Sequence, residues 1–261
     1  MRITKDEAFL NAVHNHEVFI NSLMSGSLPC FPNQDRICDT SPCINIVDGT
    51  PYNGLSFLLL KKHQRENNFP TAEYVSSEQI ENAKKDNPGV DIIKGEKGVP
   101  LSFSEKDPET SKFSYNSVTL YNVAQISNPE KINKFPEYLS QHRPKGMLYC
   151  VSSSPEDYLG EYFAAVSMNR NFMSIKEQSN EFKDQLKEKL LEKSVHFQKE
   201  GNTISVPNPL TLSKIINSSI KLSKHIIKDA LSPDPETKYY ESLEREQKQE
   251  QKQERKKVIS R

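Results

Sequence analysis

Basic and aromatic side chains alternate through the central part of the sequence, and together they could bind a single-stranded nucleic acid. Lysine and arginine neutralise phosphates, and the face of a tyrosine ring stacks on an unpaired base. The candidate binding residues are Tyr52, Asn53, Lys61, Lys62, Arg65, Tyr74, Lys94, Lys97, Tyr115 and Tyr121. Each lysine could instead lie on a solvated face, and each tyrosine could be half-buried in the core.

Two short turns carry the strongest of these candidates. Tyr52 and Asn53 stand in a Pro-Tyr-Asn-Gly turn before an expected helix, where free backbone N–H groups can also bind a phosphate. We therefore expect Tyr52 at the mouth of a DNA groove. Lys94 and Lys97 belong to a K-G-E-K-G turn, whose glycines suit the tip of a projecting hairpin.

Catalytic and metal-binding motifs are not recognisable in the sequence. The six histidines lack the H-E-x-x-H spacing of a zinc peptidase, and no glycine-rich phosphate loop stands between a strand and a helix. The four cysteines lack the close CxxC pairs of zinc folds, so we expect reduced thiols. We expect a protein that is not an enzyme and that needs no metal or other cofactor.

The overall charge gives no indication of a nucleic-acid ligand. Lysine plus arginine and aspartate plus glutamate number 35 each, so a DNA site must arise from local clustering of basic residues. The N-terminus lacks the apolar core of a signal peptide, and no segment approaches the roughly 20 apolar residues that span a bilayer. We expect a cytoplasmic protein that does not contact a membrane.

The N-terminal third of the sequence indicates three helices. Apolar residues recur at helical spacing over 6–24, and Gly26 follows where a cap is expected. Residues 27–49 contain three prolines and favour a surface loop. A second helix is expected over 55–66, and the Ser76 to Gln79 spacing predicts a capping box that starts a third helix.

A small antiparallel sheet should follow these helices. Residues 90–93, 99–103 and 113–123 are β-prone, and the K-G-E-K-G turn should join the first two in a hairpin. After Pro129 the apolar spacing becomes helical again. Three serines followed by Pro155 favour a helix N-terminus over a catalytic nucleophile.

The expected fold class is α+β, with flanking helices around the small sheet, a helical C-terminal part and a charged helical or disordered tail. The corresponding divisions are 1–135 for a DNA-binding domain, 136–235 for a helical extension and 236–261 for the tail. The tail contains almost no apolar residues after Leu243, so it should not pack on a core.

Four ordered sequence blocks resemble the ArdC-type antirestriction family. Residues 48–60, DGTPYNGLSFLLL, are similar to that family's G-x-P-Y-x-G-x-N-x-x-L-L-L segment. Tyr74-Val75 with Gln79, residues 94–98 and residues 121–125 are similar to the later blocks. Tyr74 stands where the family usually has tryptophan, Ser56 where it often has asparagine, and Ala124 where it often has aspartate.

This resemblance implies a function that composition does not. The N-terminal domain of the family binds single-stranded DNA, which implies DNA binding in a plasmid, conjugation or other mobile-element setting. The family usually continues into a zinc metallopeptidase domain, and we expect the present resemblance to be confined to the N-terminal domain, because the sequence lacks the H-E-x-x-H motif.

Two other functions remain open at the level of sequence. An ArdC-like fold could serve as a protein-interaction adaptor or a secreted effector, with the C-terminal helices binding a protein partner. A metallopeptidase remnant would need metal ligands from another chain. Convergence of the basic clusters and tyrosines on one face would favour DNA binding over the adaptor.

Overall fold

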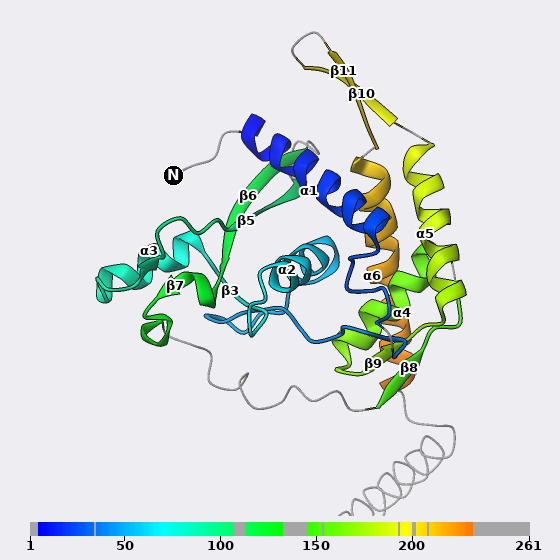
Figure 1. Cartoon of the computed structure of the whole chain (residues 1–261), viewed down its shortest axis with the longest axis horizontal. Helices are drawn as coiled ribbons and strands as arrows, with labels where there is room; N and C mark the ends of the chain where they lie inside the picture. The colour runs from blue at the N-terminus through cyan, green and yellow to red at the C-terminus, as the bar shows by residue number, and fades with distance from the viewer. Residues whose placement is uncertain are drawn as a thin grey trace, which may run out of the picture. The chain divides into compact units, whose positions relative to one another are not determined.

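The computed structural model describes residues 5–33, 35–106, 113–132, 146–152, 154–192, 194–199, 202–207 and 209–231 (Figure 1). Residues Met1–Lys224 form one compact unit and His225–Arg261 a second. The features described below lie in the first unit, except that the last helix continues into the second. The expected tail, 236–261, lies outside the described residues.

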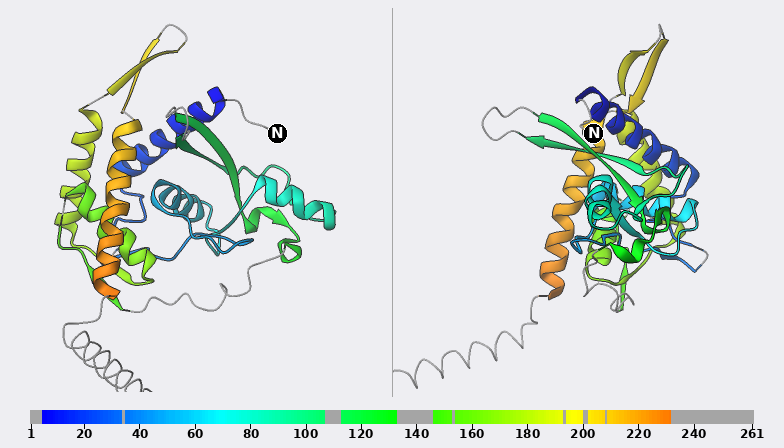
Figure 2. Two further views of the ribbon diagram at one scale, coloured as in Figure 1. Left: turned by 180° about the vertical axis from the view of Figure 1, so that it is seen from behind. Right: turned by 90° about the vertical axis from the view of Figure 1, so that its left-hand side faces the viewer.

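Helix α1, Lys5–Ser25, confirms the first predicted helix. It buries Phe19 and Leu23, and Gly26 ends it with a φ of +69°, a left-handed conformation that glycine adopts without a Cβ clash. The Asn11 amide donates a hydrogen bond of 3.0 Å to the Ser117 hydroxyl on the neighbouring sheet. Helix α1 therefore packs along that sheet, as Figure 2 shows.

The main sheet has four strands in the order β2-β3-β6-β5. They are β2, Ile44–Asn45, β3, Glu73–Ser76, β5, Val99–Lys106, and β6, Phe113–Asn122. Strand β6 pairs antiparallel with both β5 and β3, whereas β2 pairs parallel with β3. The expected small sheet is thus present, with one parallel pair at its edge.

The predicted hairpin between residues 90–93 and 99–103 is wrong. Strand β4, Asp91–Ile92, pairs instead with β7, Ile126–Ser127, in a separate two-stranded sheet. The K-G-E-K-G turn therefore connects two sheets. The reason is that β6 offers β5 a continuous antiparallel register along its whole length, which satisfies far more backbone groups than the two-residue β4 can.

Two helices beside the main sheet match their predicted positions. Helix α2, Gly54–Glu66, packs beside α1 and β5, and helix α3, Ser77–Asp86, packs beside β3, β4 and β6. The predicted capping box is confirmed: the Gln79 backbone N–H donates to the Ser76 hydroxyl at 3.1 Å, and the Ser76 N–H donates to the Gln79 side chain at 2.9 Å.

The C-terminal part is mainly helical, as expected. It contains α4, Pro155–Ser167, α5, Lys176–Leu191, and α6, Pro209–Leu231. Ser154 caps α4 by accepting a hydrogen bond of 3.3 Å from the Asp157 backbone, so the predicted helix N-terminus is confirmed. None of the described helices is long and apolar enough to cross a membrane.

Short strands accompany these helices and were not expected from the sequence. Strands β1, Ile37–Cys38, β8, Met147–Tyr149, and β9, Asn171–Met173, form a sheet in the order β1-β9-β8. Strands β10, Ser194–Lys199, and β11, Asn202–Pro207, form a hairpin. Single-turn 3₁₀ helices occupy Val123–Gln125 and Pro129–Lys131.

One large hydrophobic cluster joins the N-terminal and C-terminal parts. It contains Phe57 and Tyr74 from the first part and Tyr158, Tyr162 and Phe182 from the second. The Tyr158 and Phe182 rings stack with centroids 4.3 Å apart, and the four cysteines are free and buried. The expected boundary at residue 135 lies outside the described residues, and the cluster takes side chains from both sides of it. The α+β fold class with a helical C-terminal part is confirmed.

Candidate nucleic-acid interface

A pocket of about 220 Å³ lies between α1, α2 and the beginning of β5. Its α2 lining residues, Leu59, Lys62, His63 and Glu66, share one face of the helix because they are three or four positions apart. The other lining residues are His14, Asn15, Val18, Gly98, Val99 and Pro100. Apolar side chains and hydrogen-bonding side chains both reach this pocket.

His63 connects the pocket to the sheet. The Tyr74 hydroxyl donates its single proton to the Leu60 carbonyl at 2.8 Å, so the His63 Nδ1–H must donate to the Tyr74 oxygen, 3.1 Å away. Burial lowers the pKa of His63, although Glu66, Glu96 and the Lys97 backbone favour its protonated form. Gly98, the last residue of the loop 94–98, lines the same pocket as His63, so the loop ends beside α2.

Hydrogen bonds to Gln125 hold this loop in place. The Gln125 side-chain amide donates to the Lys97 carbonyl at 3.0 Å and to the Glu96 carboxylate at 2.8 Å. A Cβ atom on Gly98 would lie 2.7 Å from the Leu120 carbonyl oxygen, so glycine permits the close approach of the loop to β6. Lys94 and Lys97 are exposed on the loop.

Lys62 and Arg65 add positive charge on α2. The Lys62 side chain is 16% exposed, lines the pocket and forms an ion pair with Glu66 one turn along the helix. Arg65 is exposed. Lys62 and Gly98, the last residue of the loop that carries Lys94 and Lys97, line the same pocket. Lys62, Lys94 and Lys97 define what we call the basic face, whereas Arg65 stands one turn after Lys61 on a neighbouring face of α2.

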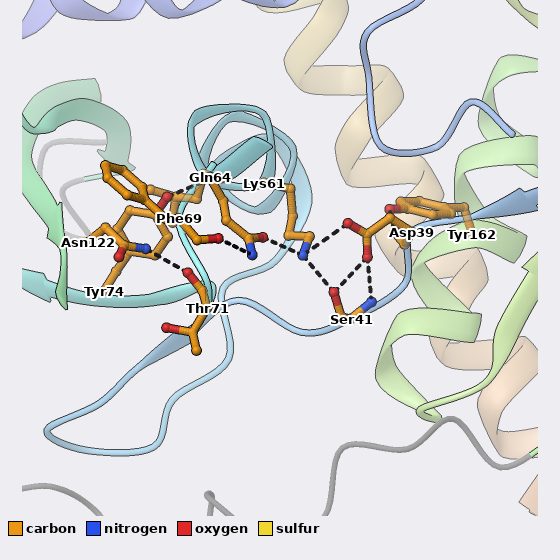
Figure 3. A network of polar contacts seen from close by, with 10 residues as sticks. Asp39, Ser41, Lys61, Gln64, Phe69, Thr71, Tyr74, Asn122 and Tyr162 are labelled. Atoms are coloured by element: carbon orange, nitrogen blue, oxygen red, sulfur yellow. Dashed lines mark hydrogen bonds and ion pairs between the residues drawn. The ribbon is translucent and has the colours of Figure 1, made fainter. Parts of the chain in front are cut away.

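Lys61 does not belong to the basic face, contrary to expectation. Its side chain is only 1% exposed, and its ammonium group contacts Asp39 at 3.1 Å, the Ser41 hydroxyl at 2.6 Å and the Gln64 side chain at 2.7 Å (Figure 3). These three partners match the three N–H donors of a lysine. Lys61 therefore has no donor left for a DNA phosphate and is not part of the candidate interface.

Two tyrosines also lie elsewhere than expected. Tyr74 is fully buried in the main cluster, where its ring cannot stack on a base. Tyr52 is half-buried and packs against the same cluster, and burial raises the pKa of its hydroxyl. Tyr52 is therefore not at the mouth of an open groove. Asn53 is exposed just before α2, and its side chain does not cap the helix.

The remaining tyrosines have different outcomes. Tyr121 is half-buried and packs beside a second hydrophobic cluster, and its ring approaches Gly98, where a Cβ would lie 3.0 Å from its Cε1. Tyr121 therefore lies beside the end of the loop that carries Lys94 and Lys97. Tyr115 lies on β6, and its side chain is outside the described residues.

Of the polar residues that line this pocket, sequence reasoning selected Lys62 and missed His14, Asn15, His63 and Glu66. The signal for His63 was present, because Leu59, Lys62, His63 and Glu66 fall on one helical face. Nothing in the spacing of His14 and Asn15 indicated that α1 would lie beside α2, since that contact depends on tertiary packing.

A metal site does not accompany the pocket. Across the residues that the structure describes, no group of three or more histidine, cysteine, aspartate or glutamate side chains is placed to hold a metal ion.

Comparisons with known proteins identify the fold. No protein-family model and no curated protein matches the sequence. The Mn(II)-bound crystal structure of the antirestriction protein ArdC from plasmid R388 is similar, with a TM-score of 0.53 and 11% identity over 85% of this chain and 98% of that chain. Its metal-free structure gives a TM-score of 0.48 and 12% identity over 84% of this chain and 97% of that chain.

The alignment with the Mn(II)-bound structure is not restricted to an N-terminal domain, because it covers nearly all of that chain. The described residues of the present chain nonetheless do not fit a bound Mn(II), since they contain no suitable ligand group. The chain therefore has an ArdC-like fold without a recognisable metal site in its described part.

Proposed function

We propose that this protein binds single-stranded DNA through the basic face, acting as a binding protein and not as an enzyme. The observation that carries the proposal is that Lys62 and His63 on α2 line one pocket with Gly98, which ends the loop that presents Lys94 and Lys97. A chain with no net charge can still bind phosphates when its cationic groups gather locally.

Two acidic residues at this face have protein partners, and the Glu66 carboxylate offsets the charge of Lys62. Glu66 is paired with Lys62, and Glu96 accepts a hydrogen bond from Gln125. Lys94 and Lys97 remain exposed and can contact phosphates. Base stacking is a smaller contribution than the sequence suggested, because Tyr74 is buried and Tyr121 is only partly accessible.

The biological setting is part of the same proposal. The ArdC structure is described as that of an antirestriction protein from a plasmid, and its fold is shared by this chain. We assign the present protein a comparable role in a plasmid or mobile element, where it coats or protects incoming single-stranded DNA in the cytoplasm.

An adaptor function is the second candidate, and one surface feature favours it. Tyr149 is 63% exposed and Val151 is 80% exposed at the end of β8, which are large values for apolar side chains. A protein partner could cover these residues. This surface does not involve the basic face, so the two candidates can be tested separately.

A titration of labelled single-stranded DNA and of duplex of the same length, each at low and high salt, tests the proposal. We expect tighter binding of the single strand and a marked loss of affinity at high salt. Equal affinity for the duplex would contradict a single-strand site. Absence of binding to either DNA would favour the adaptor.

A further inference from the structure

The pocket between α1, α2 and β5 contains two histidines as well as the Lys62 side chain of the basic face. His63 comes from α2 and is half-buried, whereas His14 comes from α1 and is exposed. Histidine is the side chain whose ordinary charge change falls between about pH 5 and 8. This pocket can therefore add positive charge beside the basic face when the pH falls.

Hydrogen bonding identifies the nitrogen of His63 that takes up the proton. The Tyr74 hydroxyl donates to the Leu60 carbonyl, so in the neutral ring His63 Nδ1 carries the hydrogen that is donated to the Tyr74 oxygen. Nε2 is then the unprotonated nitrogen. Uptake of a proton at Nε2 retains the hydrogen bond to Tyr74 and converts the ring into a cation. Acidification thus adds a charge without removing the contact that holds the ring.

The surroundings of His63 act in opposite directions on its protonation. Burial is the largest influence and lowers the pKa of His63, so the ring is mostly neutral in the free protein at neutral pH. Two carboxylates and a backbone group oppose burial, whereas one ammonium group acts with it; they belong to Glu66, Glu96, Lys97 and Lys62. Among the other neighbouring elements, α1 contributes His14 and β3 contributes Tyr74.

We propose that binding of single-stranded DNA is coupled to protonation of His63, so that the strand binds more tightly as the pH falls. This inference rests on the proposed function, because the negative charge that favours the protonated ring is that of a phosphate on the basic face. Lys62 and His63 line the same pocket, so a phosphate beside the Lys62 ammonium also lies near the ring. By linkage, a phosphate that favours protonation is itself bound more tightly by the protonated protein.

The test is a titration with oligothymidylate at about pH 7.5 and about pH 5.5 and at constant ionic strength, because thymine does not titrate between these values. Wild type should bind about five-fold more tightly at the lower pH. His63→Gln keeps a donor for the Tyr74 oxygen but stays neutral, so its affinity should be nearly the same at both pH values. The control His225→Gln removes an exposed histidine on α6 and should keep the full increase.

Proton uptake on binding separates this coupling from a structural role of His63. Calorimetric titration in two buffers that differ in ionisation enthalpy measures the protons taken up with the strand. At about pH 6.5 wild type should take up a fraction of one proton, and His63→Gln should take up almost none. If His63→Gln does not fold, His63→Asn provides a second neutral variant for the same comparison.

Three results would overturn the inference. Equal wild-type affinities at the two pH values would remove the coupling and leave the proposed function standing. An increase at low pH that persists in the neutral variants of His63 and disappears in His14→Gln would assign the proton to the other histidine of the pocket. Failure of wild type to bind the single strand at either pH would remove both the coupling and the proposed function.

Discussion

Lys61 and Lys62 are neighbours in sequence and differ completely in environment. Successive helical residues are rotated by about 100° around the helix axis. The Lys61 side chain therefore faces Asp39, whereas the Lys62 side chain lines the pocket. The spacing gave a signal for this, because Lys61 lies one turn after the buried Phe57. Composition alone suggested a basic cluster and could not distinguish the two lysines.

Tyr52 provides the prediction at the residue scale. Because its ring packs against the main cluster, Tyr52→Ala should lower the free energy of unfolding by about 2 kcal/mol, less than for a fully buried aromatic residue. Urea denaturation measures this loss. Tyr52→Phe is the matched control and should stay close to wild type in stability, because it retains the buried ring.

Single-strand affinity of the folded Tyr52→Ala protein should stay near that of wild type. A large loss of affinity without loss of stability would return Tyr52 to the DNA site and contradict its placement in the core.

Elements with strong local signals were predictable from the sequence. The Ser76 to Gln79 spacing predicted the start of α3, because both partners of a capping box lie within one turn. Strand pairing was less predictable. The partner of β4 is β7, which lies more than 30 residues further along the chain, so no local pattern identifies it. The sequence did carry a signal for β10 and β11 that was missed, because Val195, Phe197, Ile204 and Val206 alternate with polar residues.

The ion pair between Asp39 and Lys61 links the loop before β2 to α2, and it gives a prediction at the element scale. Burial tends to raise the pKa of Asp39, but Lys61 and the hydrogen bonds from Ser41 outweigh it and hold that pKa below its ordinary value. A carboxyl with a lowered folded pKa stabilises the fold above the unfolded pKa. That stability is lost as the pH falls below about 4.

Asp39→Asn should therefore reduce the free energy of unfolding at neutral pH by about 2–4 kcal/mol, because it leaves the buried Lys61 ammonium without its counter-ion. The difference between variant and wild type should shrink as the pH falls below about 4. Denaturation at several pH values measures both effects.

Asp91→Asn is the control for this prediction. Asp91 pairs with Lys84 on the surface, where solvent screens the interaction, so its loss should have little effect on stability. A similar destabilisation in both variants would show that the buried position of the Asp39 pair is unimportant.

At the scale of the whole molecule, the basic face depends on packing between distant parts of the chain. The main cluster takes aromatic residues from α2 and β3 and from α4 and α5, so the C-terminal helices help to fix the position of α2. The sequence indicated the helices of this part through their apolar spacing. It could not indicate that they share a core with the N-terminal part, because that information lies in contacts between distant residues.

The proposed DNA site requires Lys94 and Lys97 to contact phosphates of the bound strand. The most direct test is the slope of log affinity against log salt concentration for single-stranded DNA, measured for wild type, Lys94→Gln/Lys97→Gln and the control Lys221→Gln/Lys224→Gln. The control removes two exposed lysines from α6 and changes the net charge equally.

Each phosphate contact on a single strand contributes about 0.7 to this slope, so the loop variant should have a slope shallower by about 1.4. Its affinity at low salt should fall by a similar factor for every base sequence, because phosphates carry no sequence information. The control should retain the wild-type slope. Equal slopes for the loop variant and wild type would contradict the assignment of the basic face as the DNA site.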